Sequence, residues 1–342
     1  MMPVKRIKEN FSKFINNYLE KYVTELIEIN KQLGKTETHI TFHGGEPLLV
    51  GEKLLQNALE IVGKHKNTVI SVQTNGTLVD DAFIKLFKEY DVHVGVSLDG
   101  TKEMHNAYRK NFSDAGTYEI VMNNIRKMND YGVIVGALAT VTDVSVKKPE
   151  EFYQFFVDQN LPFSFNPCFT DPSAKSTCNV LNVNEYIEFY KKMFDLWISD
   201  NTNNLPVACF ERIISAMAVK KEVWMEVCSF IPDCSKTTVA IDTEGNFYRC
   251  LHYCMDGLHT IGNIVADSLK LALSDDVMAC RWNYLKEHDC KECDIQEYCY
   301  GGCPYVAETL HGTVNGKADT CLSQKAIVHH IYDYIKQYKK IS

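Results

Sequence analysis

The chain has 342 residues, of which 45% are hydrophobic and 23% are charged, and its formal net charge is −8. This length and composition predict a folded protein with one large core or two smaller ones. Because the charge is negative and no lysine or arginine run occurs, we expect no nucleic-acid or anionic-membrane surface. The sequence has no apolar stretch of about 18 residues, and its N-terminus lacks the apolar core of a signal peptide, so we expect a cytoplasmic protein.

The first half of the chain alternates between β-rich runs and stretches with helical spacing. Residues 5–33 predict one amphipathic helix, for which packing is a sufficient role. This alternating order predicts parallel strands with crossover helices, whose functional groups lie at the carboxyl ends of the strands. The expected strands lie within 38–45, 68–76, 92–100, 132–142 and 162–169, and the expected helices span 52–64, 80–89, 117–130 and 148–158.

The second half of the chain divides by composition. Residues 183–225 look mainly helical and carry no motif, which favours a bridge between two domains, and the segment after Cys321 predicts a closing helix. The expected domains are therefore 1–182, an α/β domain; 183–227, a helical bridge; and 228–342, a cysteine-rich domain.

Thirteen cysteines occur, none before Cys168 and ten from Cys228 onward. The absent export signal, the chain length and the odd count favour metal binding over disulfides. Eight thiolates suit two four-cysteine sites, and a C-x2-C spacing lets two sulfurs reach one metal centre. Gly301 and Gly302 permit a tight backbone within this framework. Zinc ribbons and buried unligated cysteines are the alternatives. The framework comprises Cys228, Cys234, Cys250, Cys290, Cys293, Cys299, Cys303 and Cys321.

The spacing of this framework closely resembles the SPASM domain of radical S-adenosylmethionine enzymes. The resemblance implies two auxiliary [4Fe-4S] clusters with interleaved ligands. The first set would be Cys228, Cys234, Cys250 and Cys303, and the second would be Cys290, Cys293, Cys299 and Cys321. The resemblance gives no role to Cys168, Cys178, Cys209, Cys254 and Cys280, which we expect to be small buried hydrophobes.

The upstream half also resembles a radical S-adenosylmethionine domain, a partial (βα)6 barrel. At the first strand end stands Gly44-Gly45-Glu46-Pro47, where glycines allow close backbone approach and Glu46 can accept hydrogen bonds from an ammonium group. In the family this motif holds the methionyl amino group of the cosubstrate. The resemblance therefore implies a binding site for S-adenosyl-L-methionine.

Further polar groups follow the next strands. Gln73-Thr74-Asn75-Gly76 resembles a family segment that faces substrate and cosubstrate, although Asn-Gly alone also predicts a turn. Ser97 and Asp99 suit ribose or carboxylate contacts, with a helix cap as the alternative. Arg109, in a family-like His-Asn-Ala-Tyr-Arg segment, is a candidate carboxylate partner. Residues 132–136 resemble a strand that lines the adenine pocket, for which a buried strand is also sufficient.

The family's C-x3-C-x2-C loop, which holds a third, catalytic [4Fe-4S] cluster, has no counterpart in this sequence. A fragment of a longer enzyme and a non-catalytic descendant are the two explanations. Without a preceding strand the run 38–43 would expose a long apolar edge, which proteins normally cover, so we favour the fragment.

The implied activity is radical chemistry on a peptide or protein side chain, through a 5′-deoxyadenosyl radical, with an electron donor such as flavodoxin or ferredoxin. The cysteine spacing is most similar to anaerobic sulfatase-maturating enzymes, which oxidise cysteine or serine to formylglycine. Leu251 stands where those enzymes have an aspartate, and a leucine cannot act as a base. His252 or Tyr253 could replace it, or the reaction could be the crosslinking of a ribosomal peptide. A non-catalytic electron-transfer protein and a zinc-stabilised module are the competing functions.

Overall fold

The computed structural model describes residues 4–168, 181–218, 234, 237–274, 277–296 and 298–341. The chain forms two compact units. The first comprises Met1–Leu98, Arg109–Leu138 and Val239–Asp275, and the second comprises Asp99–Tyr108, Ala139–Thr238 and Asp276–Ser342. Each unit therefore combines part of the α/β half with part of the cysteine-rich half.

The main sheet has five strands in sequential order, β1 to β5. The pairs β1·β2, β2·β3 and β3·β4 are parallel, with Thr38 opposite Thr68 and Val94 opposite Val135. Sequential parallel strands joined by helices form a partial TIM-like barrel. The strands are β1 (Thr38–Phe42), β2 (Thr68–Thr74), β3 (His93–Ser97), β4 (Val135–Val141) and β5 (Phe163–Pro167).

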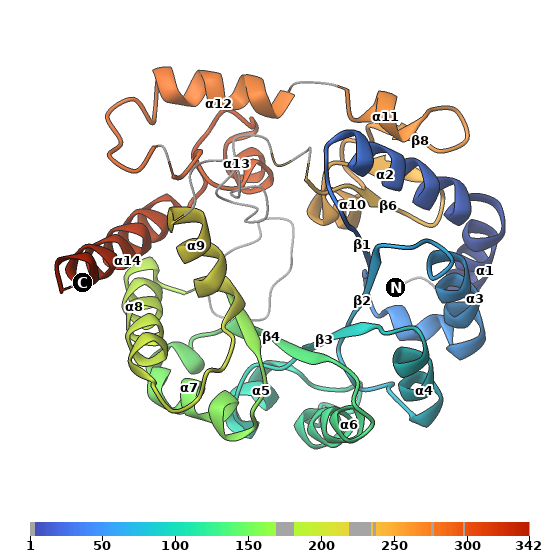
Figure 1. Ribbon diagram of the computed structural model, residues 1–342, viewed down its shortest axis with the longest axis horizontal. Coiled ribbons are helices and arrows are strands. Elements are labelled where there is room, and N and C mark those ends of the chain that lie inside the picture. Colours follow the sequence, from blue (N-terminus) through green and yellow to red (C-terminus); the bar gives the residue numbers. More distant parts are fainter. Residues whose placement is uncertain are drawn as a thin grey trace. The chain divides into compact units, whose positions relative to one another are not determined.

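The first unit begins with one long helical segment instead of one regular helix. Its α-helices α1 (Val4–Phe14) and α2 (Glu20–Gln32) are separated by a π-helical turn over Ile15–Leu19. The crossover helices α3 (Glu52–Val62), α4 (Asp81–Glu89) and α6 (Tyr118–Asp130) lie outside β1 to β3 (Figure 1). Asp80 caps α4, because its carboxylate accepts the N–H groups of Ala82 and Phe83.

A small antiparallel sheet from the cysteine-rich half completes the first unit. Its strands are β6 (Ala240–Ile241), β7 (Asn246–Tyr248) and β8 (Gly262–Asn263), with α10 (Leu251–Asp256) after β7 and α11 (Leu269–Ala272) after β8. The β6–β7 turn is held by Asp242, whose carboxylate accepts N–H groups from Glu244 and Asn246. Cys250 follows β7 and lies directly before α10.

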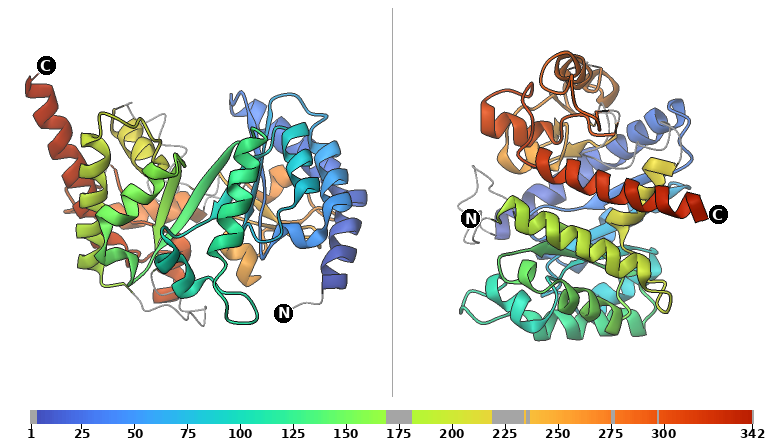
Figure 2. Two further views of the ribbon diagram at one scale, coloured as in Figure 1. Left: turned by 90° about the horizontal axis from the view of Figure 1, so that it is seen from below. Right: turned by 90° about the vertical axis from the view of Figure 1, so that its left-hand side faces the viewer.

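The second unit is built around phenylalanine rings from α7 (Pro149–Asp158), β5, α8 (Val183–Ser199) and α9 (Ala208–Ala218). The Phe156 and Phe163 rings stack with centroids 4.2 Å apart, and Phe194 contacts Phe210 and Tyr334. The last helix, α14 (Cys321–Ile341), lies along α8 (Figure 2). The unit also contains α5 (Lys102–Tyr108), α12 (Val277–Glu287) and α13 (Pro304–His311). A 3-10 turn occurs in each unit, at Pro47–Val50 in the first and at Ser145–Lys147 in the second.

The expected strands and crossover helices are all confirmed, with ends that differ by a few residues. The closing helix after Cys321 is also confirmed. Within the described residues, no helix combines the length and apolar character needed to cross a membrane.

Candidate functional site

Glu46 joins the carboxyl ends of the first two strands. Its Oε1 accepts the hydroxyl of Thr74 at 2.7 Å and the N–H of Leu48 at 3.1 Å, and its Oε2 accepts the N–H of Asn75 at 2.8 Å. Bonds to a carboxylate are stronger than those between neutral groups. The strand ends that carry the two sequence motifs are therefore fixed to each other.

The two glycines before Glu46 have backbones that other residues rarely adopt. Gly44 and Gly45 have φ values of +102° and +53°, and a Cβ on either would meet no atom within 4 Å. These two positions therefore require glycine for its backbone conformation, and the space beside each of them is open. An open glycine backbone lets a ligand approach main-chain N–H and C=O groups closely.

Gln73 lies across the neighbouring strand β3. A Cβ added to Gly95 would overlap the Gln73 amide oxygen, so Gly95 leaves the space that this side chain occupies. The Gln73 amide then donates to the hydroxyl of Ser97 at 3.4 Å, a long bond. The predicted site residues Gln73 and Ser97 are thus brought together, and Gly95 is a positioning residue that the sequence did not reveal as such.

Asp99 is 3% exposed and its carboxylate accepts the N–H of Thr140 at 2.8 Å. Its own N–H donates to Nδ1 of the buried His105 at 3.4 Å. In these contacts Asp99 connects the loop after β3 to β4. Arg109 is half-buried, and its carbonyl accepts both the N–H and the hydroxyl of Thr117.

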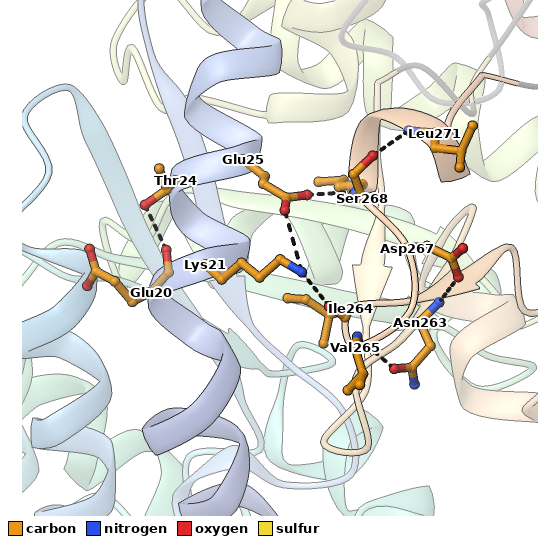
Figure 3. Close-up of polar contacts among 11 residues, drawn as sticks. Glu20, Lys21, Thr24, Glu25, Asn263, Ile264, Val265, Asp267, Ser268 and Leu271 are labelled. Atoms are coloured by element: carbon orange, nitrogen blue, oxygen red, sulfur yellow. Dashed lines mark hydrogen bonds and ion pairs between the residues drawn. The ribbon is translucent and has the colours of Figure 1, made fainter.

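Within the first unit, residues that follow β8 of the small antiparallel sheet contact α2 (Figure 3). The Glu25 carboxylate accepts the N–H of Leu269 at 2.7 Å, and the Lys21 ammonium donates to the carbonyl of Ile264. The Tyr22 ring of the same helix stacks on Phe247 with centroids 6.4 Å apart. Contacts between α2 and residues of the cysteine-rich half thereby fix the small sheet whose strand β7 precedes Cys250.

His43, the residue after β1, links this sheet to the Gly44-Gly45 loop. Burial lowers its pKa, Glu46 opposes that effect, and His252 of α10 adds to it. His252 therefore lies within electrostatic range of the first strand end. Of the two candidate bases near Leu251, His252 is exposed and Tyr253 is 4% exposed, packed against the His259 ring.

Four predicted cluster ligands lie together in the second unit. Cys290 and Cys299 are buried, and tight turns place Cys293 after Cys290 and Cys321 at the start of α14. Burial raises the pKa of Cys299 to about 12, and the thiols of Cys321 and Cys290 add to this rise. The four thiols are thus close enough to influence one another.

Among the described residues, no three His, Cys, Asp or Glu side chains converge closely enough to hold one metal ion. The choice between iron–sulfur clusters and zinc at these cysteines therefore stays a prediction.

In the first cysteine set, Cys250 belongs to the first unit, whereas Cys234 and Cys303 belong to the second. Cys228 lies outside the described residues, so the set as a whole stays a prediction. The predicted tight backbone before Cys303 is confirmed, because Gly301 and Gly302 have φ values of +82° and +75°.

Two of the five cysteines without a role differ from expectation. Cys168 is disulfide-bonded and Cys280 is exposed, so the prediction of small buried hydrophobes is wrong for these two. Loop and surface positions cannot be distinguished from core positions by residue type alone. Cys209 and Cys254 are half-buried, and burial raises the pKa of each to about 11. Cys178 lies outside the described residues.

The comparisons with known proteins agree with this geometry. The family model of the radical SAM superfamily matches residues 7–156. A cysteine-type anaerobic sulfatase-maturating enzyme of Clostridium novyi is 30% identical over 289 residues, 80% of this chain and 76% of that protein. A serine-type enzyme of Bacteroides thetaiotaomicron is 26% identical over 314 residues, 84% of this chain and 73% of that protein.

A solved structure shares the fold across both units. Native anSMEcpe with bound AdoMet and the Kp18Cys peptide superposes with a TM-score of 0.79 at 23% identity, over 94% of this chain and 91% of that chain. The chain belongs to the radical SAM superfamily, within the family of the anaerobic sulfatase-maturating enzymes.

Proposed function

We propose that this chain acts in the S-adenosylmethionine-dependent radical modification of a peptide or protein side chain. The observation that carries the proposal is the carboxylate of Glu46 beside the open backbone of Gly44 and Gly45. A carboxylate and free main-chain carbonyls are the acceptors that an ammonium group requires. The membership of the chain in the maturase family supplies the reaction class.

Each predicted ligand-binding residue has a role in this proposal. Glu46 and the glycine loop, with Pro47 setting the turn, hold the methionyl ammonium. Gln73 and Ser97, which hydrogen-bond to each other, offer amide and hydroxyl groups to the ribose. Asn75 follows the fixed end of β2 and faces substrate or cosubstrate, Asp99 orders the next loop, and Arg109 pairs with a carboxylate.

Two auxiliary [4Fe-4S] clusters are part of the proposal. The second set comprises Cys290, Cys293, Cys299 and Cys321, whose thiols lie within electrostatic range of one another, and the first set comprises Cys228, Cys234, Cys250 and Cys303. Bound clusters of this kind supply sites for single-electron transfer. We propose flavodoxin or ferredoxin as the electron donor, and the cytoplasm as the compartment in which such thiolates remain reduced.

The residues of this chain do not fit the third cluster. No cysteine occurs among the first 167 residues, so we derive no step through a catalytic cluster. In the family that cluster cleaves the cosubstrate reductively to the 5′-deoxyadenosyl radical. The same observation favours a second candidate function, a non-catalytic electron-transfer protein that keeps the auxiliary clusters.

The substrate-facing site predicted for this chain differs from that of the maturases at residue 251. Leu251 replaces the expected aspartate, and the buried Tyr253 is packed against His259. We therefore propose either a formylglycine-forming oxidation assisted by another group or a peptide crosslinking reaction. A panel of serine and cysteine peptides, analysed by mass spectrometry with and without an aldehyde-reactive hydrazide, separates the two outcomes. Formylglycine arises from serine by loss of two hydrogens, or from cysteine by loss of two hydrogens and exchange of sulfur for the oxygen of water, and it reacts with the hydrazide. A crosslink loses two hydrogens and does not react.

The test uses the chain after anaerobic reconstitution with iron and sulfide. Calorimetric titration with S-adenosylmethionine should show binding, and the variant Glu46→Gln should bind at least about tenfold more weakly, because a bond to a charged group contributes about 1.5–3 kcal/mol. Glu60→Gln, an exposed position on α3, is the matched control. Binding that Glu46→Gln leaves unchanged would refute the assigned site.

Iron and product analysis separates the two candidate functions. About eight irons per chain with cosubstrate binding and no 5′-deoxyadenosine would mean that this chain lacks the catalytic cluster. About twelve irons with 5′-deoxyadenosine would mean that an unrecognised ligand set holds it. About eight irons without any cosubstrate binding would favour the electron-transfer protein.

A further inference from the structure

Arg281 is a buried arginine at the centre of the cysteine framework of the second unit. It lies on α12 and is 4% exposed. No ion pair with a carboxylate involves it among the described residues. A buried guanidinium without an opposite charge is costly unless hydrogen bonds and nearby negative groups compensate it.

Its hydrogen bonds go to four backbone carbonyls. Nη1 donates to Tyr300 at 2.8 Å, Nη2 donates to Gly301 at 3.0 Å and to Gly316 at 3.1 Å, and Nε donates to Val314 at 2.5 Å. Four of the five N–H donors of the guanidinium are thus used. The acceptors lie in two loops, one between Cys299 and Cys303 and one between Cys303 and Cys321.

Glycine makes this arrangement possible. A Cβ on Gly301 would lie 2.5 Å from Leu285 and 3.2 Å from the guanidinium, and the residue has a φ of +82°. The backbone at residue 301 is therefore pressed against α12. The two loops cannot shift independently while Arg281 holds both of them.

The charge of Arg281 faces thiols of both cysteine sets. Burial lowers its pKa, and the thiols of Cys234, Cys303, Cys290 and Cys299 oppose that effect. Cys234 and Cys303 belong to the first proposed set and Cys290 and Cys299 to the second.

We propose that Arg281 is a positioning residue shared by the two cysteine sets: it fixes the loops that bear the ligands and places one permanent positive charge beside the clusters. The proposal rests on the proposed function, because it requires that these thiols bind iron. Arg281 exchanges no bond, proton or electron. Its charge favours the reduced state, because uptake of one electron from a one-electron donor adds one negative charge next to it.

The test compares the reconstituted full chain with three variants. Arg281→Met removes the charge and the carbonyl bonds, Arg281→Lys keeps the charge, and Lys286→Met removes a charge from the half-buried end of the same helix. Iron and sulfide are counted, and the reduced fraction of the clusters is followed by electron paramagnetic resonance during a potentiometric titration with dithionite.

We expect Arg281→Met either to lose iron or to make the clusters harder to reduce. In the second case the ratio of reduced to oxidised cluster at a fixed potential should fall about tenfold, which corresponds to a midpoint potential lower by about 59 mV for one electron. Arg281→Lys should retain iron and most of the wild-type ratio, and Lys286→Met should match the wild type. The proposal would be overturned if Arg281→Met kept the iron content and the midpoint potential of the wild type. It would also be overturned if Arg281→Lys and Arg281→Met lost iron, or shifted in potential, to the same extent. A wild-type chain that binds no iron would instead refute the proposed function.

Discussion

Replacing Tyr22 with alanine tests whether α2 carries the small antiparallel sheet. Tyr22 is 7% exposed, and Phe247 beneath it is completely buried. Removing a buried aromatic side chain costs about 3–5 kcal/mol, and the loss of the aromatic pair lies within that range. We expect the free energy of unfolding of the first unit to fall by about 4 kcal/mol.

Calorimetry of the ligand-free chain measures this effect. At about 2–4 °C per kcal/mol for a unit of this size, the melting temperature should fall by about 10 °C. Tyr18→Ala is the matched control, because Tyr18 lies one turn earlier, is half-buried and contacts Phe14 of the same helical segment. It should cost about 1 kcal/mol.

Limited proteolysis supplies a second measurement of the same perturbation. If Tyr22 fixes the sheet to α2, Tyr22→Ala should expose residues 239–274 to cleavage before the rest of the first unit unfolds. Equal melting temperatures for the Tyr22 and Tyr18 variants, with unchanged cleavage, would refute the reasoning. The sheet would then be held by contacts other than this stack.

Three further outcomes follow from the site. Thr74→Val should lower the free energy of unfolding by about 1–3 kcal/mol in chemical denaturation, because Glu46 loses one of its three donors. Cys250→Ala should lower the iron content after reconstitution, whereas Cys254→Ala, one turn later on the same helix, should leave it unchanged. Asp99→Ala should cost about 1–3 kcal/mol by thermal melting, because the partly buried N–H of Thr140 loses the carboxylate that accepts it.

The elements of the sheet could be predicted because they depend on local patterns. Short runs rich in β-forming residues, followed by turn-forming residues, marked β1 to β5. The π-helical turn at Ile15–Leu19 could not be predicted, because its residues have ordinary helical spacing. The motifs at the ends of β1 and β2 were predicted to lie at strand ends, and the bonds from Thr74 and Asn75 to Glu46 join these two ends.

The assignment of residues 239–275 to the first unit could not be predicted. It depends on contacts such as Lys21 to Ile264, across 243 residues, and neither residue type indicates its partner. Arg281 was also missed, since one arginine on a short helix normally lies on the surface. Gly95 carried a usable signal, because glycine inside a strand often marks a close approach of another group.

The bonds of Glu46 also limit how it can hold a ligand. A carboxylate has about four acceptor positions, and Leu48, Thr74 and Asn75 fill three of them. An ammonium group has three donors, so Glu46 can satisfy about one of them without breaking its own bonds. The other acceptors must come from nearby backbone, and the open, left-handed Gly44-Gly45 segment is placed to supply carbonyls. Because the carboxylate is already held by three hydrogen bonds, ligand binding would cost this side chain little further conformational entropy.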